Sequence, residues 1–259
     1  MFDKIKDFFV MRGVENKLDK IVRNPKHLQK IDIYNQILKP CDDIIAKNSN
    51  NYRAYCAKAL LYYLMCDYEN ALNCYQKVHE KFIFSGFILN KTSRQRMLDC
   101  CDKLIEADPN NSKLYMDKAD ILEFTYSVYK PELVLKCYDK ALSLNPENLV
   151  EIVWYKAEFL DEIEQRKDHN LNKHVTALTF FDEVIQSYPE HIVELISHKA
   201  NFLYCYCETK DYDILSFFDE SAQAYPQHSK EILAKKEEFI KSLEPEWTPD
   251  MEIPDFLRK

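Results

Sequence analysis

Strings of nearly the same six letters occur four times in this chain. "NCYQKV" (73–78) and "KCYDKA" (136–141) are followed by "TFFDEV" (179–184) and "SFFDES" (216–221). Each string stands at a matching place in its local context, which a chance recurrence would not do four times. The chain is therefore predicted to consist of copies of one structural unit.

Longer blocks extend these matches. "LKPCDDIIAKNSNNYRAYCAKA" (38–59) aligns with "LDCCDKLIEADPNNSKLYMDKA" (98–119) without a gap, and each block places a proline or asparagine corner between two helical stretches. Proline disfavours a helical conformation in the residue before it and cannot continue the helical hydrogen bonding. The corner prolines are Pro146, Pro189 and Pro226, so helices are predicted to end near Leu144, Tyr188 and Tyr225.

Apolar residues return at helical spacing on both sides of each corner. The first helices carry the trios Tyr55, Ala59, Tyr62; Tyr115, Ala119, Leu122; Val153, Ala157, Leu160; and Ile196, Ala200, Leu203. The second helices carry Ala71, Tyr75, Val78; Val134, Tyr138, Ala141; Ala177, Phe181, Val184; and Ile214, Phe218, Ser221. Steps of three and four place each trio on one helix face. A small residue in the middle lets neighbouring helices approach closely, so Ala119→Leu is predicted to overpack, whereas Asp117→Leu, on the expected solvent side, is not.

Composition supports an all-helical fold and narrows the function classes. Only two glycines occur, which leaves almost nothing for hairpin turns or glycine-rich phosphate loops. Hydrophobic residues make up 46% of the chain, enough for a sizeable core. The net charge of −8 opposes binding to nucleic acid, because that affinity depends on lysine and arginine contacts to phosphates.

The nine cysteines are an odd number and lie within amphipathic stretches. No "CxxC" spacing occurs, so neither a disulfide framework nor a metal site is predicted, and the thiols are interpreted as small apolar fillers in a reducing, cytoplasmic compartment. The charged opening "MFDKIKDFFVMRG" does not fit a secretion signal, and no stretch is long enough for a membrane span. No cofactor is predicted.

The repeated pattern resembles the tetratricopeptide repeat, a helix-turn-helix unit of about 34 residues. In "YRAYCAKALLYYLMCDYENALNCYQKV" (52–78), the residues at the family's key positions are Tyr55, Ala59, Tyr62, Tyr68, Ala71, Tyr75 and Val78. The resemblance covers roughly residues 31–243. It implies an all-α fold, an α-solenoid of stacked helix-turn-helix repeats that forms a right-handed superhelix.

Three regions are expected along the chain. Residues 1–30 form an N-terminal amphipathic capping region, in which Phe2, Ile5 and Phe9 share a stripe that packs on the stack or, alternatively, lies on a membrane surface. Residues 31–243 form the repeat array, with its clearest copies at 52–80, 112–146, 150–189 and 193–226 and a cap helix at 229–243. Residues 244–259 form an extended tail with three prolines.

The array departs from the repeat pattern at three places. The segment "FIFSGFILN" (82–90) leaves too few residues for a full helix pair before the next copy. The third copy contains a polar insertion, after which its second helix is predicted to begin near Val175. In the last helix, Lys236 is expected at the small-residue position, as in a polar cap that keeps a stacked array soluble.

In the family resembled here, the first helices line the concave side. The corresponding residues are Tyr63; Lys113, Met116, Asp120 and Glu123; Glu151, Trp154, Glu158 and Asp161; and Glu194, Asn201 and Tyr204. We interpret them as an acidic, aromatic groove for a protein or peptide segment bearing lysine or arginine, with Trp154 as the anchor. The alternative interpretation is a solvated charged face with one tryptophan capping the core.

Three function hypotheses remain open at this point. The first is a non-enzymatic interaction module or adaptor. The second is a self-associating structural component, joined through the C-terminal tail or through "FIFSGFIL". The third is an effector or enzyme that uses the insertion at 163–175, where Asp168, His169 and His174 cluster. No nucleophile motif accompanies these residues, so no catalytic residue is predicted.

Overall fold

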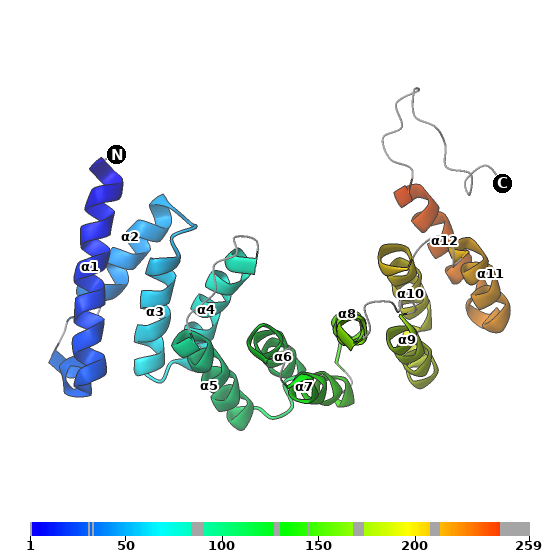
Figure 1. Cartoon of the computed structure of the whole chain (residues 1–259), viewed down its shortest axis with the longest axis horizontal. Helices are drawn as coiled ribbons and strands as arrows, with labels where there is room; N and C mark the ends of the chain where they lie inside the picture. Colours follow the sequence, from blue (N-terminus) through cyan, green and yellow to red (C-terminus); the bar gives the residue numbers. More distant parts are fainter. Residues whose placement is uncertain are drawn as a thin grey trace. The chain divides into compact units, whose positions relative to one another are not determined.

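Every secondary-structure element in the described part of the computed structural model is a helix (Figure 1). The structure describes residues 2–30, 32, 34–83, 91–126, 130–144, 146–167, 174–207 and 213–243. The chain divides into two compact units, Met1–Pro146 and Glu147–Lys259, and each is described by itself below. The predicted all-α class is confirmed for the described residues.

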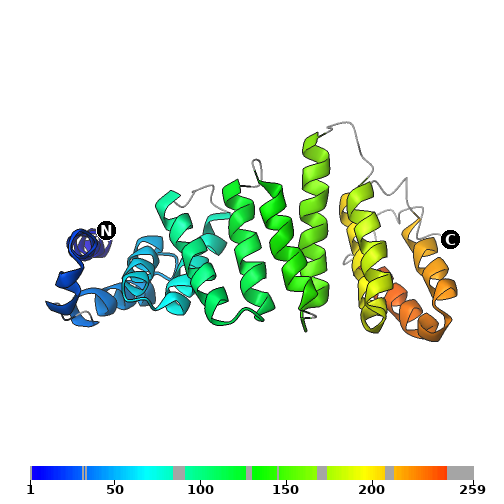
Figure 2. The same cartoon turned by 90° about the horizontal axis from the view of Figure 1, so that it is seen from below.

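The first unit is a series of helices in which each α-helix packs on the next α-helix along the chain. They are α1 (Phe2–Arg23), the 3₁₀ helix η1 (Pro25–Lys30), the π-helix η2 (Tyr34–Leu38), α2 (Lys39–Lys47), α3 (Tyr52–Leu64), α4 (Tyr68–Ile83), α5 (Lys91–Ala107), α6 (Ser112–Tyr126) and α7 (Pro131–Ser143). Figure 2 shows the helices between residues 91 and 143 side by side, as their contacts require.

The second unit follows the same plan. Its elements are α8 (Leu149–Lys167), α9 (Val175–Ser187), the 3₁₀ helix η3 (Pro189–His191), α10 (Ile192–Tyr206), α11 (Ile214–Ala224), the 3₁₀ helix η4 (Pro226–His228) and α12 (Ser229–Leu243). Helix α10 packs on α8, α9, α11 and α12, so it is the centre of this unit.

The residues predicted to pack small beside large are buried in both units. The alanines at the middle of the first-helix trios are all 0% exposed: Ala59, Ala119, Ala157 and Ala200. The aromatic residues at the middle of the second-helix trios are at most 2% exposed: Tyr75, Tyr138, Phe181 and Phe218. Burial of these eight side chains is what the repeat pattern required, since alanine gives room for the neighbouring ring.

The predicted helix ends are also confirmed. Leu144, Tyr188 and Tyr225 are the C-terminal caps of α7, α9 and α11. In the second unit the corner prolines Pro189 and Pro226 open short 3₁₀ turns, after which the next helix starts at once. Helix α9 begins at Val175, as predicted from the end of the insertion.

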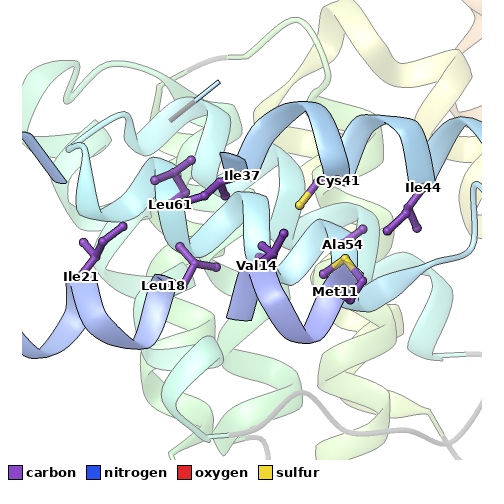
Figure 3. Packing of buried hydrophobic residues seen from close by; sticks show 10 residues of the cluster. Met11, Val14, Leu18, Ile21, Ile37, Cys41, Ile44, Ala54 and Leu61 are labelled. Carbon is purple, nitrogen blue, oxygen red and sulfur yellow. The ribbon is translucent and has the colours of Figure 1, made fainter. Parts of the chain in front are cut away.

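The N-terminal helix packs on its neighbours through residues that follow the predicted stripe in the chain. Its buried residues Met11, Val14, Leu18 and Ile21 follow steps of three and four, and they join a cluster from η2, α2 and α3 (Figure 3). Phe9, expected on the buried stripe, is 64% exposed. Phe9 therefore does not pack on the stack as predicted. The prediction used only the first turns, whereas α1 continues to Arg23 and packs through residues Met11 to Ile21.

Some predictions lie outside the described residues. They concern the tail at 244–259, most of "FIFSGFILN" and the middle of the insertion, including Asp168 and His169. Helix α5, which begins after residues 84–90, packs against both α4 and α6.

A lysine of one helix repeatedly binds an aspartate of the helix before it. The pairs are Lys58 with Asp42, Lys118 with Asp102, Lys199 with Asp182, and Lys236 with Asp219. In three of them the lysine directly precedes the buried alanine. Lys236 therefore corresponds to Lys199, and not to the small residue Ala200 as predicted, because its partner matches that of Lys199.

Candidate functional site

A hollow of about 490 Å³ lies between α8 and α10 in the second unit. Its lining consists of Val150, Glu151, Trp154 and Tyr155 from α8 with His198 and Asn201 from α10. The residues of α8 are spaced so that Val150 and Trp154 are one turn apart, as are Glu151 and Tyr155. Both helices are held in place by their buried faces, so the hollow has a rigid base.

Trp154 is fixed by three aromatic neighbours. Its ring stands edge to face against His198, at 5.8 Å between centroids, and against Phe202, at 6.0 Å. Tyr206 is tilted against it at 6.4 Å. Edge-to-face geometry is a favourable arrangement of aromatic rings. The indole therefore needs little reordering to contact a partner, which lowers the entropic cost of binding.

The rim of the hollow is acidic and aromatic. Glu151 is exposed and lies in the first turn of α8, where the helix dipole favours a carboxylate, and it accepts a 3.3 Å hydrogen bond from the Asn148 amide. Tyr155 is 42% exposed. None of the described lining residues is lysine or arginine. The local charge thus complements a cation.

His198 contributes a neutral ring to the hollow. Burial lowers the pKa of its imidazole, and the nearby Glu194 carboxylate only partly opposes this. Its Nδ1 atom is shielded from solvent and has no hydrogen-bond partner among the described residues. An imidazole in this setting does not repel a positively charged side chain at neutral pH.

The structure brings together part of the predicted groove. Glu151, Trp154 and Asn201 line the hollow, and the exposed Glu194 lies one turn before His198 on α10. Glu158 accepts a hydrogen bond from the Tyr206 hydroxyl. Burial, followed by this hydrogen bond, raises the pKa of Tyr206. Glu158 therefore helps to hold one of the rings that support Trp154.

Two predicted groove residues of the second unit lie elsewhere. Tyr204 packs edge to face on Phe239 of α12 at 5.7 Å. Asp161 is only 3% exposed, where it contacts His174 Nδ1 and accepts a 2.7 Å hydrogen bond from Gln165. The periodicity that placed Asp161 on the groove did not account for His174, which lies 13 residues further along the chain and packs against this carboxylate.

The predicted groove residues of the first unit are engaged by their neighbours. The Tyr63 hydroxyl donates to Asp99 at 3.2 Å, and Lys113 lies 3.0 Å from Asp117. Met116 and Glu123 are half-buried in α6, with the Tyr138 hydroxyl 3.5 Å from Glu123, while Asp120 is exposed.

A larger hollow of about 940 Å³ lies at α1, the end of α2 and the start of α3. Its charges are paired: Lys47 lies 3.2 Å from Asp7, and Arg53 makes two hydrogen bonds to Glu15, at 3.0 and 2.7 Å. Arg53 also stacks 5.1 Å from the centre of the Phe8 ring. Because its charges already have partners, we consider this hollow a weaker candidate for a ligand site than the one at Trp154.

In the described ranges, the histidine, cysteine and acidic residues outside these two hollows do not gather into a metal site. No group of three or more His, Cys, Asp or Glu residues there has the arrangement to hold a metal ion. All nine cysteines are described and are free thiols. Burial raises the pKa of Cys41 and Cys100 to about 12, so these thiols stay protonated. Across those same ranges, no helix has the length and apolar character that crossing a membrane requires.

Three lining residues were missed from the sequence: Val150, Tyr155 and His198. A signal was available for two of them, because Val150 precedes Trp154 by one turn and Tyr155 follows Glu151 by one turn. His198 could not be found this way, since its role depends on how closely α10 approaches α8.

Comparison with known proteins adds no assignment. The chain matches no family model, and no curated protein is significantly similar to it.

Proposed function

We propose that this protein is a non-enzymatic interaction module that binds a partner segment bearing lysine or arginine. In this proposal the chain is an α-solenoid of tetratricopeptide-like repeats that forms a right-handed superhelix, and the first helices present the acidic, aromatic face to the partner. The buried alanines and rings support the repeat assignment, because they occupy the positions that the resemblance requires.

One observation carries the proposal. The hollow at Trp154 combines an aromatic anchor, held by its neighbours, with a carboxylate rim and a described lining that lacks cations. Tryptophan and tyrosine dominate the energetics of protein interfaces, and complementary charge guides the partner to the site. A surface that only had to remain soluble would not require a fixed, partly exposed indole.

The position of His174 supports an interaction module better than an enzyme. Of the residues that the third hypothesis would use, His174 is 5% exposed and contacts the buried Asp161. A general acid or base must reach its substrate within hydrogen-bond distance. In its observed position this pair instead joins the start of α9 to α8. The free, largely buried thiols also fit the proposed reducing, cytoplasmic compartment.

The proposal is tested by the binding of a fluorescein-labelled twelve-residue peptide in which arginine and lysine alternate with glycine and serine. Fluorescence anisotropy should show saturable binding, and a peptide with glutamine at the basic positions should not bind. The variant Glu151→Lys, Glu194→Lys should weaken binding about tenfold or more, because it reverses the charge at the hollow.

The control variant is Glu183→Lys, Glu220→Lys, which makes the same charge change at exposed positions of α9 and α11. The affinity of this control for the peptide should stay within about twofold of that of the original protein, because salt largely screens exposed charges that lie far from the hollow. Asp161 is unsuitable for charge reversal, because a lysine there would disrupt a buried pair. Equal loss of affinity in both double variants would show that only net charge matters and would contradict the proposal.

A further inference from the structure

The hollow at Trp154 distinguishes between the two basic side chains that the partner segment could carry. Its volume of about 490 Å³ lies within the range of small-molecule pockets, roughly 300–1,000 Å³, and is ample for one long side chain. Its described lining offers the aromatic rings of Trp154 and Tyr155, the imidazole of His198, the Glu151 carboxylate and the Asn201 carboxamide.

These groups differ in what they offer to arginine and to lysine. A guanidinium is planar and weakly hydrated, stacks on aromatic rings and donates two parallel hydrogen bonds to a carboxylate. An ammonium is compact and strongly hydrated, so it loses more when it leaves water for an aromatic surface. Trp154 and Tyr155 supply the rings, while Glu151 and the Asn201 carbonyl supply the acceptors.

Neighbouring aromatic rings hold the Trp154 ring in place. The Trp154 ring is bounded by His198 and Phe202, and Phe202 in turn stacks on Tyr206 at 4.7 Å. Because the rings contact one another, Trp154 cannot turn into the core without displacing its neighbours. A flexible aromatic surface would adapt to either cation, whereas a fixed one favours the planar group.

We propose that this hollow is an arginine subsite, in which the guanidinium of a partner arginine lies on the Trp154 and Tyr155 rings and pairs with Glu151. The inference rests on the proposed function and narrows it, because it names the side chain that the module selects. The arginine stem covers the apolar surface around Val150, and the partner backbone remains outside the hollow.

The chain provides its own reporter for this subsite. It has two tryptophans, Trp154 and Trp247, so the variant Trp247→Phe leaves Trp154 as the sole source of indole emission. The probes are three blocked tripeptides, acetyl-Gly-X-Gly-amide, with arginine, lysine or citrulline at X. Citrulline keeps the planar shape of arginine but carries no charge. Each is titrated into the single-tryptophan protein while emission is recorded.

The arginine probe should change Trp154 emission saturably, and the lysine probe should need about fivefold higher concentration or more. The citrulline probe should have no saturable effect. Glu151→Gln should weaken arginine binding about fivefold or more, whereas Glu220→Gln, an equal charge change on α11, should leave it unchanged. Circular dichroism of each variant confirms that the helices remain intact.

The outcomes separate this inference from the proposed function. If the arginine and lysine probes bind equally, the subsite does not select arginine, although the module still binds basic segments. If neither probe changes the emission while the twelve-residue basic peptide is bound, the hollow is not the subsite and the proposed function stands. If that longer peptide also fails to bind, the proposed function itself is wrong.

Discussion

Lys199 donates a hydrogen bond to Asp182, so that the ammonium group of α10 reaches back to α9. The lysine is only 8% exposed, and its ammonium also lies 5.5 Å from the centre of the Phe217 ring of α11. One side chain of α10 therefore contacts both the helix before it and the helix after it. The related pair of Lys236 and Asp219 repeats the tether between α11 and α12.

Removing the aspartate charge should destabilise the second unit. Asp182→Asn keeps the size of the side chain but leaves the nearly buried Lys199 ammonium without its anionic partner. Because Asp182 itself is largely exposed, solvent will compensate in part, and we expect a loss of about 1–2 kcal/mol in the free energy of unfolding. Urea unfolding followed by Trp154 emission in the Trp247→Phe background measures it. Glu183→Gln, at the next position, is the matched control and should change little.

The burial of the alanines predicts that a larger side chain at one of these positions destabilises the protein. Ala119 is fully buried on α6, so Ala119→Leu should overpack the contacts with α5 and α7 and cost about 1–3 kcal/mol. Asp117 is not the solvent-side control that the sequence indicated, since it is half-buried and pairs with Lys113. The exposed Asp120 is a better one. Equal decreases in melting temperature for Ala119→Leu and Asp120→Leu would argue against close packing at Ala119.

Much of the fold could be predicted from the sequence because the repeat is local. Within each helix pair, the positions of alanine, aromatic residues and corner prolines are set by helical periodicity and by the conformational limits of proline. Those rules placed Ala59, Tyr75 and the cap at Tyr188 correctly. The same rules failed at α1, where Phe9 is exposed, because the packed face depends on where along the helix its neighbour lies.

The candidate site was predicted less completely, since it depends on contacts between distant segments. The pattern of α8 identified Glu151 and Trp154, but it could not show that His198 of α10 would complete the hollow. It also placed Asp161 on the surface. That carboxylate is buried because His174 packs against it across the insertion, a contact that no local period encodes.

The buried pair of Asp161 and His174 should contribute to stability instead of binding. Asp161→Ala would leave the His174 imidazole buried without this partner and would remove the acceptor of Gln165, so we expect a loss of about 2–3 kcal/mol. Chemical unfolding of the single-tryptophan protein measures the change. Glu162→Ala, one residue further on the more exposed side of α8, should cost about 0.5 kcal/mol or less.

A double-mutant cycle distinguishes an interaction between Asp161 and His174 from a general loss of stability in α8. If the two side chains act together, the loss in Asp161→Ala, His174→Ala should be clearly smaller than the sum of the two single losses. Additive losses would show that the contact has no energetic role. A negligible loss in Asp161→Ala together with weaker peptide binding would instead place this carboxylate in the groove.

Acidification should weaken the second unit through His198. Its pKa in the folded protein is lowered below the ordinary value of 6.5, chiefly by burial, so below that pH the unfolded chain binds more protons at this residue than the folded protein does. The stability that depends on the neutral ring is therefore complete above pH 6.5 and decreases as the pH falls toward the folded-state pKa.

The measurement is the unfolding free energy of the protein and of His198→Gln at a series of pH values between neutral and mildly acidic. The difference between them removes the titration of the other groups, and it should shift in favour of the variant as the pH falls, because glutamine does not titrate. His191→Gln, in the 3₁₀ turn before α10, is the control for loss of a histidine from the same unit. A difference that stays constant with pH for His198→Gln would contradict the burial of a neutral imidazole beside Trp154.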